Sequence, residues 1–140
     1  MTTLDETFAY WNYDVEVWFS GPYHIDLLVD EARQVEGVVA AESWGRQDTT
    51  RIRDDDTESA DIRILAPPPE SKLINPNLLA GRWLLAEDEN AIVLNSQILD
   101  EEPDIKIGDY INLDLNGHES AWQVVGVVQS TLGRPTAYTN

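Results

Sequence analysis

The sequence lacks cysteine altogether, so it can form neither a disulfide framework nor a thiolate metal site. Its 140 residues fit a single domain. A globule of this size hides roughly two thirds of the surface that its unfolded chain exposes, which is enough for a core without covalent staples. We therefore expect one domain that folds through apolar burial.

Basic residues are scarce. Nine lysines and arginines face 26 acidic residues, which gives a formal net charge of −17. Nucleic acid and anionic lipid would both be repelled, because binding them requires many basic side chains at phosphates. No nucleic-acid partner is expected. The acidity serves either solubility or the attraction of a basic partner, and the sequence leaves these two alternatives open.

Long apolar runs are also missing, and no stretch approaches the roughly 18 residues that a membrane span needs. The opening residues MTTLDETFAY are acidic and polar, unlike a secretory signal. Taken alone, the chain is expected to be soluble and cytoplasmic.

The first half alternates between extended and helical patterns. Residues 13–20 alternate apolar and polar side chains, which predicts a half-buried strand. Residues 23–37 place apolar side chains at helical spacing, and Gly37 is a plausible stop. An extended pattern then runs from Val38 towards Ile52. This order predicts a β-α-β unit.

The middle of the chain mixes turns with short elements. A charged turn over 54–61 precedes a short strand over 62–65, and three successive prolines follow. Pro76 suits the first position of a helix that would stop near Gly81. The apolar run 91–95 predicts a buried strand.

Ser96 is a candidate N-cap for a second short helix, which Pro103 ends. Asn116-Gly117 then predicts a hairpin, because both residues tolerate the positive φ of a type I′ turn. The return strand is apolar on both faces over 122–128, which predicts a place inside the sheet. Residues 130–140 read as a connection leaving the domain.

Together these elements predict an α+β fold in one domain over 1–140. Its N-terminal β-α-β layer would span residues 1–65, and a β-rich subdomain with a C-terminal hairpin would span residues 66–140.

Reactive groups are hard to find. The two histidines, His24 and His118, lie far apart and have no second ligand at helical or hairpin spacing. No nucleophile elbow, phosphate-binding glycine loop or dinucleotide fingerprint occurs. No enzyme activity, catalytic residue or cofactor is therefore expected.

Acidic runs supply carboxylates without a recognisable metal-binding order. Residues 54–61 could bind a hard cation such as calcium, but they lack the spacing of an EF-hand loop. Such runs are more often solvated turns, and the same applies to 87–89 and 100–104.

Three residues are candidates for contact with a partner protein: Trp18, Trp44 and Arg82. Trp and Arg are common at interface hot spots. Trp18 lies opposite the apolar face of its predicted strand, and Trp44 stands beside a glycine in a polar stretch. For Arg82 and its neighbour Trp83 the favoured interpretation is structural, with Trp83 in the core and Arg82 paired nearby.

The order of motifs from residue 78 onward resembles the extracytoplasmic core domain of ABC-transporter permeases of the MacB/FtsX type. The matching segments are Gly81-Arg82-Trp83, the strand 92–95, Ile107-Gly108-Asp109-Tyr110-Ile111 and the strand 122–128. Residues 35–42, VEGVVAAE, fit the first half of that family more loosely.

The resemblance implies a non-catalytic domain held outside the membrane between transmembrane helices. It would relay ATP-driven movement to a substrate, lipoprotein or adaptor, while a separate cytoplasmic ATPase binds ATP. The membrane-tethered, extracytoplasmic location that it implies replaces the cytoplasmic expectation above.

Two departures accompany the resemblance. The sequence contains no membrane helix, and it stops where the family would continue into a second β-α segment. An exposed sheet edge would result, which favours a homodimer of this fragment. The alternative is a free-standing, soluble, acidic protein that binds a basic partner or a cation.

Overall fold

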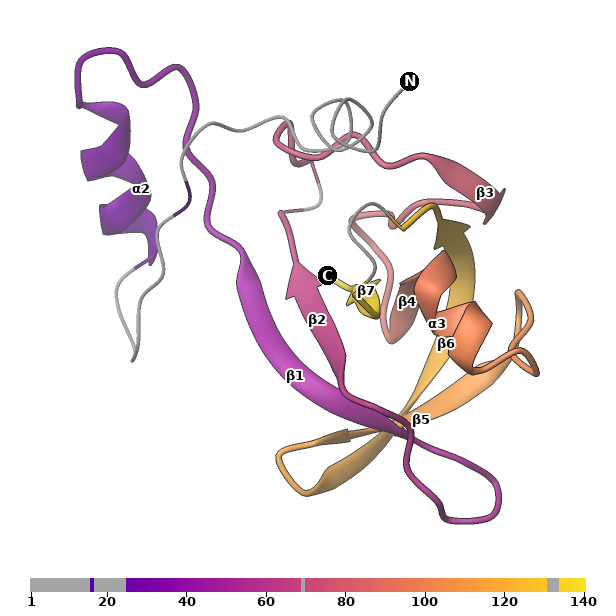
Figure 1. Ribbon diagram of the computed structural model, residues 1–140. Coiled ribbons are helices and arrows are strands. Elements are labelled where there is room, and N and C mark those ends of the chain that lie inside the picture. Colours follow the sequence, from indigo (N-terminus) through magenta and orange to yellow (C-terminus); the bar gives the residue numbers. More distant parts are fainter. Residues whose placement is uncertain (1–15, 17–24, 69, 131–133) are drawn as a thin grey trace.

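The computed structural model describes residue 16 and residues 25–68, 70–130 and 134–140. These residues form a strand-rich α+β fold with two helices and seven strands (Figure 1). The elements in chain order are α2 (Ile25–Arg33), β1 (Gly45–Ile52), β2 (Ile62–Ala66), β3 (Leu78–Gly81), β4 (Ala91–Asn95), α3 (Ser96–Glu101), β5 (Tyr110–Leu115), β6 (His118–Val128) and β7 (Thr136–Tyr138).

All seven strands belong to one sheet that closes on itself. The strand order is β3-β6-β4-β7-β2-β1-β5, and β5 also pairs with β6. Six strands therefore form a closed ring, and β3 is attached to β6 outside it. Closure leaves each ring strand with a neighbour on both sides, which removes the open edges that favour aggregation.

The predicted hairpin is confirmed. β5 and β6 pair antiparallel from Tyr110↔Gln123 to Leu115↔His118. The turn residues Asn116 and Gly117 have φ values of 54° and 80°, as a type I′ turn requires. β6 also pairs with β3 and β4, so the prediction that it lies inside the sheet is confirmed.

Strand β4 is buried on both faces, as predicted. Its side chains alternate between two apolar clusters: Ile92 and Leu94 belong to the first, and Ala91 and Val93 to the second. The first cluster includes Ile98 of α3. Each fully buried Ile, Val or Leu stabilises the fold by roughly 1.5–3 kcal/mol. Burial on both faces of β4 thus provides the centre of the core.

The second cluster is completed by residues from the long connections between strands. Its buried members are Ile74, Leu84, Ala91, Val93, Val128 and Tyr138, and Trp44 and Trp83 pack against it. The rings of Trp83 and Tyr138 lie 5.2 Å apart between centroids at an interplanar angle of 54°. This tilted aromatic pair fixes the start of the 83–90 connection against β7.

The prediction of a helix from Pro76 to Gly81 is wrong. Residues 78–81 form β3, which pairs antiparallel with β6 from Leu78↔Val128 to Gly81↔Gly126. The segment is too short to offset the cost of helix nucleation, whereas the exposed edge of β6 supplies backbone partners at once. Gly81 is indeed at a positive φ of 69°, but it ends a strand.

The prediction that residues 130–140 are a connection leaving the domain is also wrong. Residues 136–138 form β7, which lies between β2 and β4 in the ring. Ala137 and Tyr138 are buried. A strand of three residues is too short to show an alternating pattern of apolar and polar residues in the sequence. Its extended conformation depends on the neighbouring strands β2 and β4.

The N-cap of α3 is Asn95, not Ser96. The Asn95 side chain accepts a hydrogen bond from the Ile98 N–H at 3.2 Å. The Ser96 hydroxyl instead accepts from the Ser130 N–H at 2.9 Å. The cap is therefore one residue earlier than the sequence predicted, and Ser96 instead connects the start of α3 to Ser130.

The first half of the chain agrees with its prediction in part. α2 is shorter than the predicted helix and lies to one side of the sheet in Figure 1. β1 begins at Gly45, well after Val38. Except for residue 16, the strand predicted over 13–20 lies outside the described residues. β1 and β2 share a sheet with the strands of 66–140, and the free edge of this sheet is β3. The homodimer stays a prediction.

Helix length excludes a membrane span within the described part of the chain, since neither α2 nor α3 is long and apolar enough to cross a bilayer.

We expect Gly126→Ala to destabilise the protein by about 3 kcal/mol or more, because overpacking against a rigid backbone is costly. A Cβ on Gly126 would collide with the carbonyl oxygen of Arg82, which cannot move while Arg82 N–H donates to Val125 O at 3.0 Å. Urea unfolding followed by tryptophan fluorescence measures the effect.

Gly108→Ala is the matched control for Gly126→Ala. Gly108 has a φ of 92° but open space at its Cβ position, so only backbone strain of about 1–2 kcal/mol is expected. Equal losses in both variants would contradict the close approach of β3 to β6.

Candidate functional site

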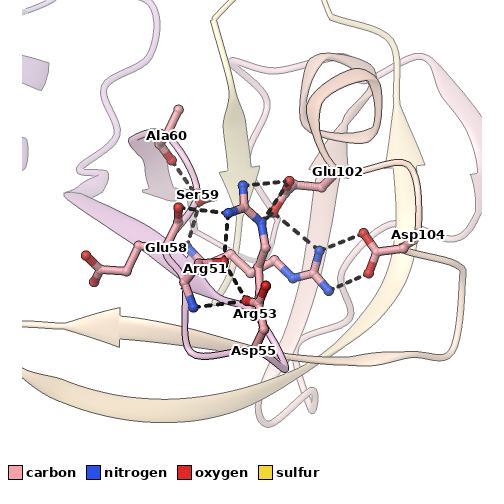
Figure 2. Close-up of polar contacts among 9 residues, drawn as sticks. Arg51, Arg53, Asp55, Glu58, Ser59, Ala60, Glu102 and Asp104 are labelled. Atoms are coloured by element: carbon pink, nitrogen blue, oxygen red, sulfur yellow. Dashed lines mark hydrogen bonds and ion pairs between the residues drawn. The ribbon is translucent and has the colours of Figure 1, made fainter.

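Arg51 of β1 and Arg53, which directly follows β1, meet two carboxylates just after the end of α3 (Figure 2). Arg51 and Arg53 are two residues apart on an extended chain, so their side chains project to the same side. Glu102 caps the C-terminus of α3, and its N–H donates to Ile98 O at 2.7 Å. Asp104 follows two residues later. Two arginines and two carboxylates, each pair separated by one residue in the sequence, therefore face each other.

Arg51 is held by both carboxylates. Its Nη1 and Nη2 donate to the two oxygens of Asp104 at 2.9 and 2.7 Å, a bidentate geometry. Nη1 also lies 3.4 Å from Glu102 Oε1. Arg51 is 7% exposed and Glu102 is 5% exposed. These charges are therefore removed from water and depend on each other.

Arg53 extends the network to the β1–β2 loop. Its Nε and Nη2 donate to Glu102 Oε1 at 2.9 Å and Oε2 at 3.1 Å. Its Nη1 donates to the Thr57 hydroxyl at 3.1 Å and to the Glu58 carbonyl at 3.0 Å. One guanidinium thus ties the loop to the end of α3, and we call Arg51, Arg53, Glu102 and Asp104 the ion-pair network.

Charge balance makes this arrangement stable. The ion-pair network contains two positive and two negative side chains. The hydrogen bonds that Arg51 donates to Asp104 raise the pKa of Arg51 and lower the pKa of Asp104. The hydrogen bonds that Arg53 donates to Glu102 raise the pKa of Arg53.

The prediction that 100–104 is a solvated acidic run is wrong for Glu102, which is buried. The reason is that its charge is satisfied by two arginines, an interaction between segments about 50 residues apart. The equal spacing of Arg51-Ile52-Arg53 and Glu102-Pro103-Asp104 is the one sequence signal that would have pointed to it.

The acidic turn 54–61 is mostly exposed. Asp55 accepts hydrogen bonds from the N–H and hydroxyl of Thr57, which lower the pKa of Asp55. Within the described ranges there is no group of three or more histidines and acids that could hold a metal ion. His118 is exposed and begins β6, and His24 lies outside the described residues.

The structure does not bring the three candidate contact residues together. Arg82 forms a bidentate pair with Asp88 at 2.8 and 2.9 Å and remains 45% exposed. Trp44 is half-buried against the second apolar cluster, and its indole donates to Glu42 at 3.0 Å. Trp18 lies outside the described residues. The favoured structural interpretation of Arg82 and Trp83 thus agrees with their contacts, and a partner contact stays a prediction.

An apolar groove of about 460 Å³ lies between β3, α3 and the 105–107 segment. Leu79 and Ile107 line it and are 56% and 43% exposed. Asp100 and Lys106 are the charged residues along it. Most of the other residues that line the groove are apolar.

No protein-family model and no curated protein matches the sequence. Solved structures do resemble it. The extracellular domain of the noncanonic ABC-type transporter YknZ from Gram-positive bacteria is 15% identical with a TM-score of 0.59, over 82% of this chain and 61% of that chain.

Two further solved structures share the fold. The periplasmic region of MacB from Actinobacillus actinomycetemcomitans is 14% identical, with a TM-score of 0.52 over 79% of this chain and 52% of that one. A domain of a putative permease protein from Porphyromonas gingivalis is 15% identical, with a TM-score of 0.53 over 77% of this chain and 49% of that one. This chain thus has the fold of extracytoplasmic permease domains, which confirms the resemblance, and it spans about half to three fifths of their length.

Glu102→Gln tests the ion-pair network. We expect a loss of about 2–3 kcal/mol in the free energy of unfolding, slightly below the roughly 3–5 kcal/mol typical of a broken buried pair, because Arg51 keeps Asp104. Urea unfolding measures it. Glu101→Gln, which removes the same charge from an exposed neighbour, is the control. The network is refuted as a stabilising contact if both variants lose the same amount.

Asp104→Asn tests the pH dependence. The folded pKa of Asp104 is below its unfolded value of about 3.9, so its stabilisation is present above that pH and is lost as the pH falls towards the folded pKa. Urea unfolding at pH 7 and pH 3 should show the variant less stable at pH 7 and the difference shrinking at pH 3. Asp100→Asn, at an exposed position of α3, is the control, and a difference that is constant with pH would contradict the assignment.

Proposed function

We propose that this chain is a non-catalytic extracytoplasmic domain of an ABC-transporter permease. The observation that carries the proposal is the fold, which is shared with three solved domains described as extracellular, periplasmic or permease-derived, over 77–82% of this chain. Fold alone does not dictate function. The chemistry of the described residues is compatible with it, because the polar residues brought together are paired with one another.

The proposed activity is mechanical. A domain that relays ATP-driven movement of membrane helices must move as a rigid body. The closed ring gives each of its strands two neighbours, and the ion-pair network fastens β1 to the end of α3. Both features make the domain rigid, so that movement of the membrane helices would be transmitted through it and not lost in deformation of the domain.

The partners in this proposal are the transmembrane helices of the permease and the ATPase that drives them. An adaptor, a lipoprotein or the transported substrate would be met outside the membrane. The domain itself would be membrane-tethered in the parent protein and would face the periplasm or the cell surface.

Trp18, Trp44 and Arg82 remain our proposed partner contacts. For Arg82, the pair with Asp88 holds the guanidinium in one orientation while leaving it 45% exposed, which reduces the entropy lost on binding. Trp44 is partly buried and packs against the second apolar cluster. The proposal for Trp18 rests on the sequence.

Surface labelling tests the proposed location. The sequence has no cysteine, so Glu119→Cys, at an exposed position of β6, introduces a unique thiol into it. We expect a membrane-impermeant maleimide to label this variant in intact cells of the native host, beyond any labelling of the wild type. The labelled protein should sediment with the membranes.

Leu113→Cys is the matched control, since Leu113 is 0% exposed and its thiol should be protected in the folded protein. Labelling of Glu119→Cys only after lysis, with the protein in the soluble fraction, would overturn the proposal. That outcome would favour the alternative, a free-standing acidic protein that binds a basic partner or a cation.

A further inference from the structure

Strand β3 is the free edge of the sheet. It is the one described strand with a neighbour on one side only, because it pairs with β6 and lies outside the closed ring (Figure 1). All four of its residues, Leu78–Gly81, are exposed. An edge strand presents a row of backbone N–H and C=O groups with which a further extended chain can pair. β3 is therefore the place where this sheet can accept another strand.

The apolar groove lies directly beside this edge. Its exposed lining includes Leu79 of β3 and Ile107. Three other lining residues are buried: Ile105, Val124 and Val127. Apolar side chains that remain exposed next to one another mark contact sites, whereas isolated ones are ordinary surface features. The groove thus reaches from exposed apolar side chains down to the core.

An irregularity in β3 brings a second apolar residue to the groove. Leu79 and Ala80 are consecutive, and a regular strand would turn their side chains to opposite faces. Both line the groove, however, and the register of β3 on β6 shifts between Leu78 and Ala80. Such bulges redirect side chains at sheet edges and are frequent beside functional sites. The backbone of β3 is therefore shaped towards the groove.

Charge limits what can occupy this surface. A second copy of the chain would bring a second net charge of −17, and the two copies would repel each other. Along the groove lie Asp100 of α3 and Lys106, and Glu101 is exposed next to Asp100. The α3 side of the groove therefore complements a basic group, which the field of the whole chain would also attract.

We propose that β3 and the adjoining groove bind a short extended segment of a partner protein. The segment adds to β3 as a further strand, places apolar side chains from alternate positions into the groove and carries a basic residue facing Asp100. In this mode of recognition backbone hydrogen bonds provide affinity and side-chain pockets provide specificity. A groove of about 460 Å³ accommodates a few apolar side chains. The binding goes beyond the proposed permease function and is tested independently of it.

Selection from a library of random short peptides tests the proposal. The peptides are displayed on phage and selected on the purified whole chain, and the strongest binder is synthesised. We expect apolar residues separated by one position, a neighbouring lysine or arginine, and a dissociation constant that rises with salt. The peptide should shift the backbone amide NMR signals of residues 78–81 and 105–107. The proposal is overturned if no peptide is enriched, or if the bound peptide shifts only signals elsewhere on the chain.

Leu79→Ala should weaken binding of the selected peptide about tenfold, because alanine buries less apolar surface in the complex. Leu85→Ala is the matched control, since Leu85 is 45% exposed and is not among the residues that line the groove. Amide-signal dispersion reports whether each variant is folded, and Ile107→Ala replaces Leu79→Ala if the latter is not. Equal affinity of the wild type and the folded groove variant would refute the site.

N-methylation of the peptide tests whether it adds as a strand. Only alternate N–H groups of an added strand face β3, so methylation of that set should abolish binding and methylation of the other set should preserve it. Equal effects of the two sets would overturn strand addition. Sedimentation equilibrium of the peptide-free chain checks the other occupant. A dimer that Leu79→Ala dissociates would show that a second copy fills the edge, which would likewise overturn the proposal.

Discussion

The pairing of β5 with β6 is the constraint on which the rest of the structure depends. Without it the seven strands would form an open sheet that ends at β5 and β3. With it, β6 contributes hydrogen bonds to three neighbours, and the first apolar cluster gathers side chains from β2, β4, β5, β6 and β7. The turn that permits this pairing consists of two residues at positive φ, Asn116 and Gly117. A local conformational preference therefore determines a closure that involves the whole sheet.

Closure also explains why charges occur beside the core. Thr49 and Arg51 are buried residues of β1, where an apolar chain would be expected. Arg51 meets Glu102 at the end of α3, and the two opposite charges compensate each other there. Apolar residues of equal volume would stabilise such a site at least as well. The ion pairs add directional specificity. The N–H groups of a guanidinium form good hydrogen bonds in only one orientation of α3 relative to β1, whereas apolar contacts tolerate several orientations.

Much of the fold follows from the sequence where local preference and tertiary context agree. The hairpin at Asn116-Gly117 and the buried strand 91–95 are of this kind, because turn chemistry and apolar burial act on adjacent residues. β3 and β7 are different. Each has three or four residues, and each is extended only because a neighbouring strand offers hydrogen bonds. No pattern within such short segments carries that information.

The ion-pair network could not be predicted from the sequence for a related reason. Charge counts do not describe the surroundings of an individual residue, and Glu102 resembles its solvated neighbours in the sequence until the fold brings Arg51 and Arg53 to it.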